Sequence, residues 1–95
     1  MSDDSVIRHF DIVNVKGLHA RASARFVEVV EDHDASATVR RDGLSAAGDS
    51  IMGLLMLAAS RGKTIDVQTS GPDAEALADA IEALRALVSR GFEEE

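Results

Sequence analysis

The chain alternates between segments whose apolar residues recur at every second position and segments whose apolar residues recur at helical intervals. In residues 6–13, Phe10 and Ile12 flank a polar residue, which is the spacing of a strand with one buried face. Farther along, Ala22, Phe26 and Val30 recur at the spacing of one helical face. The spacing of apolar residues, together with the turn signals between segments, predicts strands at residues 6–13, 36–41, 44–47 and 64–69. It predicts helices at residues 20–31, 51–59 and from about 73 to 89.

The order of these segments, β-α-β-β-α-β-α, favours an α+β fold. Strands with alternating polarity bury one face and leave the other exposed to solvent, which predicts an antiparallel sheet with all three helices on one face. Asp42-Gly43 joins two of the strands and has the composition of a two-residue hairpin turn. We expect one domain over residues 1–95, with an ordered core at about 6–90 and an acidic C-terminal tail at 91–95.

Composition excludes several classes of function. The net charge of −7 has the wrong sign for a general nucleic-acid binder, and the chain lacks the Trp and Tyr residues used for base stacking. It contains no cysteine, which removes thiol catalysis and Cys-based zinc sites, and no other spacing suggests a metal. The polar start and the shortness of the apolar stretch at residues 51–59 predict a cytoplasmic protein without membrane insertion.

His19 stands out among the three histidines because it directly precedes a predicted helix. His9 and His33 are expected to be plain surface residues. A helix start presents unpaired backbone N–H groups and the positive end of the dipole, so the amides of Ala20 and Arg21 are candidate phosphate ligands. The same dipole favours the neutral, nucleophilic imidazole of His19 over the imidazolium. The alternative, that His19 merely caps the helix, stays open at this point.

Basic residues gather around His19 although the chain as a whole is acidic. Residues 1–41 carry six basic and seven acidic side chains, whereas residues 42–95 carry four and ten. Lys16, Arg21 and Arg25 lie close to His19 in sequence, and no carboxylate lies near enough in sequence to orient its ring. This pattern favours phosphoryl carriage over hydrolytic triad chemistry. Local positive charge also suits docking on acidic partner surfaces.

Two short motifs resemble those of one known family. Residues 17–21, Gly-Leu-His-Ala-Arg, resemble the active-site motif of HPr, the histidine phosphocarrier of the bacterial phosphotransferase system, and of its nitrogen-related paralogue NPr. Residues 49–53, Asp-Ser-Ile-Met-Gly, resemble the family's regulatory-serine segment. The resemblance covers about residues 6–90 and implies the family's open-faced β-sandwich. One departure is Ala22-Ser23, where the family usually has Pro-Ala.

The resemblance also implies roles for individual residues. His19 would take a phosphoryl group at Nδ1 from phosphorylated enzyme I and pass it to an EIIA-type protein, with Arg21 stabilising the phosphoryl group. Ser50 would match the serine that HPr kinase/phosphorylase modifies in many bacteria. Such a protein needs no cofactor and is a phosphoryl carrier rather than a stand-alone enzyme. Whether the chain is of the HPr or the NPr branch stays open.

The second predicted helix carries more apolar residues than one buried stripe requires. We expect Leu54 and Leu57 to be buried, and Ile51, Met52 and Leu55 to form an exposed docking surface together with Lys16 and Arg25. Ser50 suits the N-cap of this helix, and Gly62 suits its exit. Phosphorylation of Ser50 would add roughly two negative charges beside the surface. Two alternatives remain: a regulatory adaptor that acts through Ser50 without phosphoryl carriage, and an unrelated small-ligand-binding domain.

Overall fold

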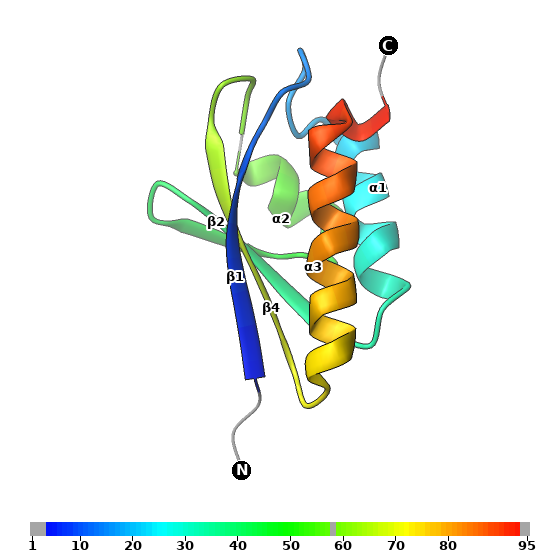
Figure 1. Cartoon of the computed structure of the whole chain (residues 1–95). Coiled ribbons are helices and arrows are strands. Elements are labelled where there is room, and N and C mark those ends of the chain that lie inside the picture. The colour runs from blue at the N-terminus through cyan, green and yellow to red at the C-terminus, as the bar shows by residue number, and fades with distance from the viewer. Residues whose placement is uncertain (1–3, 58, 94–95) are drawn as a thin grey trace.

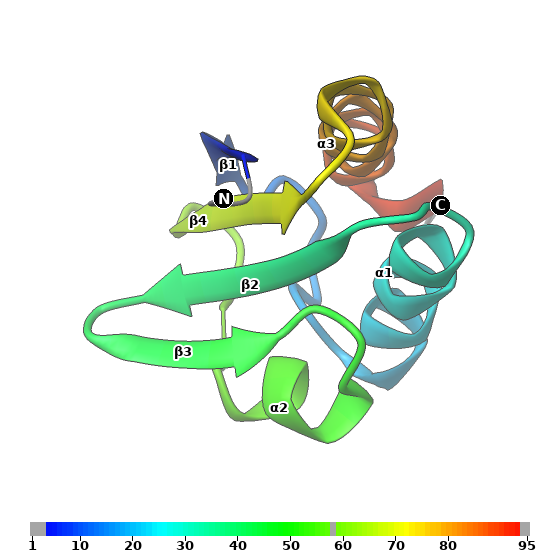
Figure 2. The ribbon, with the colours of Figure 1, turned by 90° about the horizontal axis from the view of Figure 1, so that it is seen from below.

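Four antiparallel strands form one sheet in the order β1-β4-β2-β3, and the helices cover one of its faces (Figures 1 and 2). The computed structural model describes residues 4–57 and 59–93. Its elements are β1 (Asp4–Asp11), α1 (Ala20–Glu31), β2 (Ser36–Arg41), β3 (Leu44–Ala47), α2 (Ile51–Met56), β4 (Thr64–Gly71), α3 (Ala74–Ser89) and a 3₁₀ turn, η1 (Gly91–Glu93). The predicted α+β class and element order are confirmed.

The β2–β3 hairpin turns where its sequence predicts. Asp42 and Gly43 both have positive φ angles, 50° and 81°, which a two-residue turn of this kind requires. The turn sets the register, in which Arg41 pairs with Leu44 and Val39 with Ala46. Val39 thereby faces the helices and is fully buried, so the short hairpin contributes to the core.

The core lies between the sheet and the three helices. Helix α3 packs on β1 and β4, α2 packs on β3, and α1 contacts both other helices (Figure 2). On α3 the apolar stripe of Leu77, Ile81, Leu84 and Val88 is buried throughout. On α1 the buried face includes Val27 and Ser23 beside Ala22, Phe26 and Val30, while Val29 is only partly buried.

The predicted limits of β1, the end of β4 and the end of α2 are wrong. Strand β4 continues to Gly71 rather than to residue 69, because Ser70 and Gly71 still pair with β1. Strand β1 starts and ends two residues earlier than predicted, since its first residue pairs with Gly71 of β4. Helix α2 ends at Met56 rather than at residue 59, although Leu57 and Ala59 are still buried. Gly62 therefore does not end α2. It lies in the turn before β4, with φ at 88°, and donates its N–H to the Ile12 carbonyl.

The C-terminal segment packs against the core beyond the predicted limit at residue 90. Gly91 and Phe92 both have positive φ angles, which turn the chain back after α3. Phe92 is 2% exposed and belongs to the hydrophobic core, so the ordered core extends beyond the predicted limit at about residue 90. Residues 94 and 95 of the acidic tail lie outside the described residues. No helix in the described part of the chain has both the length and the apolar character that a membrane span needs.

Candidate functional site

His19 is the N-cap of α1, and its side chain closes the helix start. Its backbone is extended, with φ −75° and ψ −179°, as N-cap residues usually are. The ring Nδ1 accepts hydrogen bonds from the backbone N–H groups of Arg21, at 3.2 Å, and Ala22, at 3.4 Å. Because a backbone N–H can only donate, Nδ1 carries a lone pair, and the proton of the neutral ring sits on Nε2. Nδ1 is therefore held in the nucleophilic form.

The backbone amides predicted to bind phosphate, those of Ala20 and Arg21, stay a prediction. In the structure, the N–H groups of Arg21 and Ala22 donate to the His19 ring. This follows from N-cap geometry, in which a side chain reaches the second and third helical residues rather than the first. A proline at position 22 would have no N–H to offer, so the Ala22 contact depends on the departure from the usual family motif.

The loop before His19 is fitted tightly against the segment that follows α2. Gly17 has a φ of +62°, and a Cβ at this position would lie 2.1 Å from the Ala59 carbonyl oxygen. The next residue, Leu18, donates its N–H to that same oxygen at 2.9 Å. Glycine is required here for two reasons, the left-handed backbone and the close approach of a second chain segment.

Asn14 is a site residue that the sequence analysis missed. It is 6% exposed, and its side-chain Nδ2 donates to the Gly17 carbonyl oxygen at 2.8 Å, while the Gly17 N–H donates back to the Asn14 carbonyl at 3.2 Å. The sequence did contain a signal. Asn at the first and Gly at the fourth position of a four-residue segment is a preferred pattern of type I turns.

The predicted basic residues are all on the surface near the start of α1. Lys16, Arg21 and Arg25 are exposed, and the two arginines stand four residues apart on the helix, which places them on one face. The first turn of α1 contains no acidic side chain. An arriving phosphoryl group would thus meet the positive helix end together with exposed cationic side chains, without a nearby carboxylate in that turn to repel it.

The other two histidines lie apart from this site. His9 is exposed on the open face of the sheet, where its Nδ1 is hydrogen-bonded to Asp66 across the β1–β4 pair. His33 follows α1, and its Nδ1 lies 2.7 Å from the Val29 carbonyl oxygen. Within residues 4–57 and 59–93, no group of three or more His, Asp or Glu side chains could hold a metal ion.

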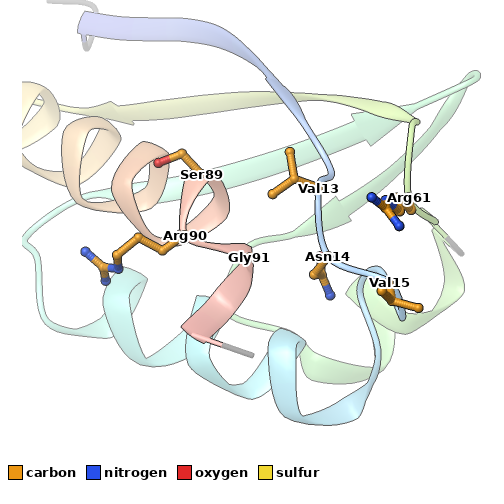
Figure 3. A pocket seen from close by; sticks show the side chains of 7 residues that line it. All are labelled: Val13, Asn14, Val15, Arg61, Ser89, Arg90 and Gly91. Atoms are coloured by element: carbon orange, nitrogen blue, oxygen red, sulfur yellow. The ribbon is translucent and has the colours of Figure 1, made fainter. Parts of the chain in front are cut away.

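A cavity of about 330 Å³ lies behind the loop, between Asn14 and the end of α3 (Figure 3). Arg61 and Arg90 are among its lining residues, but Figure 3 shows them on opposite sides with their guanidinium groups far apart. The carboxyl end of α3, which faces this cavity, carries the negative end of the helix dipole. The cavity therefore lacks the converging positive charge that His19 has.

Comparisons with known proteins also point to a phosphorylation site in this chain. Residues 6–89 match the family model of the PTS HPr component phosphorylation site. The phosphocarrier protein HPr of Cupriavidus necator is 39% identical over 87 residues, which cover 92% of this chain and 94% of that protein. The phosphocarrier protein NPr of Escherichia coli K12 is 36% identical over 86 residues, covering 90% and 92%. The crystal structure of HPr-C-His from Thermoanaerobacter tengcongensis has a TM-score of 0.79 and 33% identity, covering 100% of this chain and 99% of that one.

The chain belongs to the HPr family. It is a histidine phosphocarrier of the phosphotransferase system, as the two motifs implied, and the alternative of an unrelated ligand-binding domain is wrong. Relatives named HPr and relatives named NPr are about equally similar to it, so overall identity does not assign the branch.

Ser50 is the N-cap of α2, as predicted. Its Oγ accepts a hydrogen bond from the Gly53 N–H at 3.0 Å, which makes it the N-cap of α2. A Cβ on Gly53 would lie 3.1 Å from both this Oγ and the Ala46 Cβ, so the small residue lets the cap and β3 approach. The first turn of α2 contains no acidic residue.

The apolar residues of α2 divide largely as predicted for an HPr-like carrier. Leu54 and Leu57 are buried, whereas Ile51 is 41% and Met52 69% exposed. Leu55, predicted to belong to the exposed group, is only half-exposed, and Met56, which was not assigned, is 73% exposed. Exposed apolar side chains thus cover the outer side of a helix that contacts α1 (Figure 2).

Arg41 is a second residue that sequence reasoning missed. Its side chain is 17% exposed, and Nη1 donates to the Leu57 carbonyl oxygen, the C-cap of α2, at 2.8 Å. The arginine therefore connects the end of β2 to the end of α2. A cation at the carboxyl end of a helix also complements the helix dipole.

Proposed function

We propose that His19 is the phosphoryl acceptor of this phosphocarrier, through Nδ1, with phosphorylated enzyme I as donor and an EIIA-type protein as recipient. The observation that supports this most directly is the pair of backbone N–H groups that keep the Nδ1 lone pair unprotonated. The other ring nitrogen, Nε2, is buried, which disfavours attack on phosphorus from that nitrogen.

In the proposed step, the Nδ1 lone pair attacks phosphorus while the bond from phosphorus to the donor breaks, and the electron pair of that bond stays with the donor. The new P–N bond uses the lone pair that had accepted the N–H groups of Arg21 and Ala22. These two donors then become available to the phosphoryl oxygens at the moment when negative charge arrives. In the transfer to the recipient, the P–N bond breaks, its electron pair returns to Nδ1, and phosphorus forms a bond to the recipient.

The guanidinium of Arg21 is proposed to pair with the phosphoryl oxygens. It is exposed at the second helical position, directly beside the amides, and its planar fork matches two oxygens at once. Lys16 and Arg25 are proposed to attract acidic partner surfaces rather than to contact the phosphoryl group. Their role would be seen mainly in the association rate and in its dependence on salt.

The exposed apolar residues of α2 are proposed to be the docking surface for both protein partners. Its members are Ile51, Met52, Leu55 and, as an addition from the structure, Met56. Methionine adapts its shape easily, which suits a surface that must contact a donor and a recipient in turn. The surface and His19 are linked through the contact between α1 and α2.

Ser50 is proposed to be a regulatory phosphorylation site for a kinase of the HPr kinase/phosphorylase type. Its Oγ already faces a helix N-terminus, where a phosphate would be tolerated, so the fold should change little. The added negative charge would stand beside Ile51 and Met52 and would weaken docking to an acidic partner. A protein with phosphate on Ser50 should therefore show a slower transfer to His19.

The decisive experiment is incubation with phosphoenolpyruvate and enzyme I, followed by mass spectrometry. We expect one added phosphoryl group that is labile in acid and absent from His19→Ala. His9→Ala and His33→Ala are matched controls and should be labelled like the wild type. Labelling of His19→Ala under the same conditions would overturn the assignment. Running sugar-type and nitrogen-type enzyme I side by side would also assign the branch from the relative rates.

A further inference from the structure

The Gly17 carbonyl oxygen connects Asn14 directly to His19. It accepts the side-chain Nδ2 of Asn14 at 2.8 Å and the backbone N–H of His19 at 2.9 Å. Because a carbonyl oxygen only accepts, the Asn14 amide must present its NH₂ group here, so its orientation is defined by its partner. The direction of the Gly17 peptide thus depends on both residues.

Asn14 also lies beside the segment that follows α3. An added Cβ on Gly91 would be in ordinary contact with it, 3.4 Å from the Asn14 Cβ. Figure 3 shows Asn14 on the connection between Val13 and Val15, with its amide directed away from Ser89. Asn14 therefore has the C-terminal segment on its Cβ side and the Gly17 peptide on its amide.

The backbone on the other side of Gly17 leaves little room for adjustment. The Ala59 carbonyl oxygen occupies the place where a Gly17 side chain would be, and it accepts the Leu18 N–H. The Leu18 N–H and the Gly17 oxygen belong to one peptide, so Ala59 and Asn14 hold its two ends. If the Asn14 donor were lost, only the bond to Ala59 would remain, and the Gly17 oxygen could shift together with the His19 N–H bonded to it. A shift of the N-cap residue would then change the direction in which Nδ1 points.

We propose that Asn14 is a positioning residue for phosphoryl transfer, which orients His19 through the Gly17 carbonyl oxygen without touching the phosphoryl group. This inference rests on the proposed function of His19. Because Asn14 would act in the chemical step, loss of its side chain should lower the rate of transfer within the docked complex. The affinity for the donor should stay nearly unchanged.

The test compares Asn14→Ala and Asn14→Asp with the wild type. Alanine removes the donor, and aspartate replaces it with a carboxylate that repels the Gly17 oxygen. Initial rates of phosphorylation are measured at rising concentrations of phosphorylated enzyme I. We expect the saturating rate to fall about 10- to 100-fold, since small misplacements of a reacting group have effects of that size. The half-saturating donor concentration should change by less than about twofold.

Thr69→Val is the matched control for general loss of stability. Thr69 is 1% exposed, and its hydroxyl donates to the carbonyl oxygen of Leu77 in α3. The Thr69→Val variant therefore loses a buried side-chain hydrogen bond that has no connection to His19. We expect a lower melting temperature and an unchanged saturating rate. In addition, the backbone ¹H–¹⁵N resonance of His19 should move in Asn14→Ala and stay in place in Thr69→Val.

An unchanged saturating rate in both folded Asn14 variants, or a rise in the half-saturating concentration alone, would overturn the inference. So would an unmoved His19 amide resonance, which is measured without any phosphotransfer. Failure of the proposed function has a different signature, because the wild type would then remain unlabelled or His19→Ala would be labelled.

Discussion

The Ala22 N–H can be removed from the site by a single substitution, Ala22→Pro. This amide lies in the first turn of α1 and donates to His19 Nδ1, so a proline here breaks no hydrogen bond of the helix backbone. Other members of the family usually have proline at this position, which indicates that the fold accommodates its ring. The substitution therefore removes a single hydrogen-bond donor and measures what that donor contributes to the phosphorylated form.

The size of the effect follows from the geometry. Hydrogen bonds to charged groups contribute about 1.5 to 3 kcal/mol. The Ala22 nitrogen lies 3.4 Å from Nδ1 and the Arg21 nitrogen 3.2 Å, so we take the lower end of that range, about 1.5 kcal/mol. Since about 1.4 kcal/mol corresponds to a factor of ten, the phosphorylated form of Ala22→Pro should be disfavoured about tenfold.

The assay is the equilibrium between phosphorylated and free protein at fixed ratios of phosphoenolpyruvate to pyruvate, with catalytic enzyme I and detection by ³¹P NMR. Ala22→Val is the control, because it adds bulk at a residue that is 1% exposed but keeps the N–H. An equilibrium that is unchanged in folded Ala22→Pro, or shifted equally in Ala22→Val, would refute the idea that this amide stabilises the phosphoryl group.

The remaining predictions concern the loop, the cap and the docking surface. Gly17→Ala should lower the free energy of unfolding by more than about 2 kcal/mol, because its Cβ would lie 2.1 Å from the Ala59 carbonyl oxygen; urea unfolding that matches the wild type would contradict this. Ser50→Ala should lose about 1 kcal/mol from the lost cap while His19 is still phosphorylated, as urea unfolding and labelling together would show. Met52→Asp should raise the half-saturating concentration of phosphorylated enzyme I about tenfold at an unchanged saturating rate. Ile7→Asp, at an exposed residue of β1 on the opposite edge of the sheet from β3, should leave that concentration unchanged, and equal effects of the two substitutions would argue against a docking surface on α2.

Elements with local signals were predicted most accurately. Helix α1 begins after His19 and the β2–β3 hairpin turns at Asp42-Gly43, as predicted, because capping and turn geometry depend on neighbouring residues. The end of α2 was predicted too late. Leu57 and Ala59 continue its apolar pattern and are buried, but their carbonyl oxygens accept hydrogen bonds from Arg41 and from the Leu18 N–H, which lie in other segments of the chain, rather than from a further helical turn.

The sequence by itself determined the order of strands and helices, the place of His19 at a helix start and the basic character around it. These properties follow from periodicity and from residues a few positions apart. Tertiary structure decided that Gly17 must fit against the Ala59 carbonyl oxygen, that Arg41 binds the end of α2, and that Phe92 belongs to the core. All three depend on contacts between segments far apart in the chain, which only the folded molecule defines.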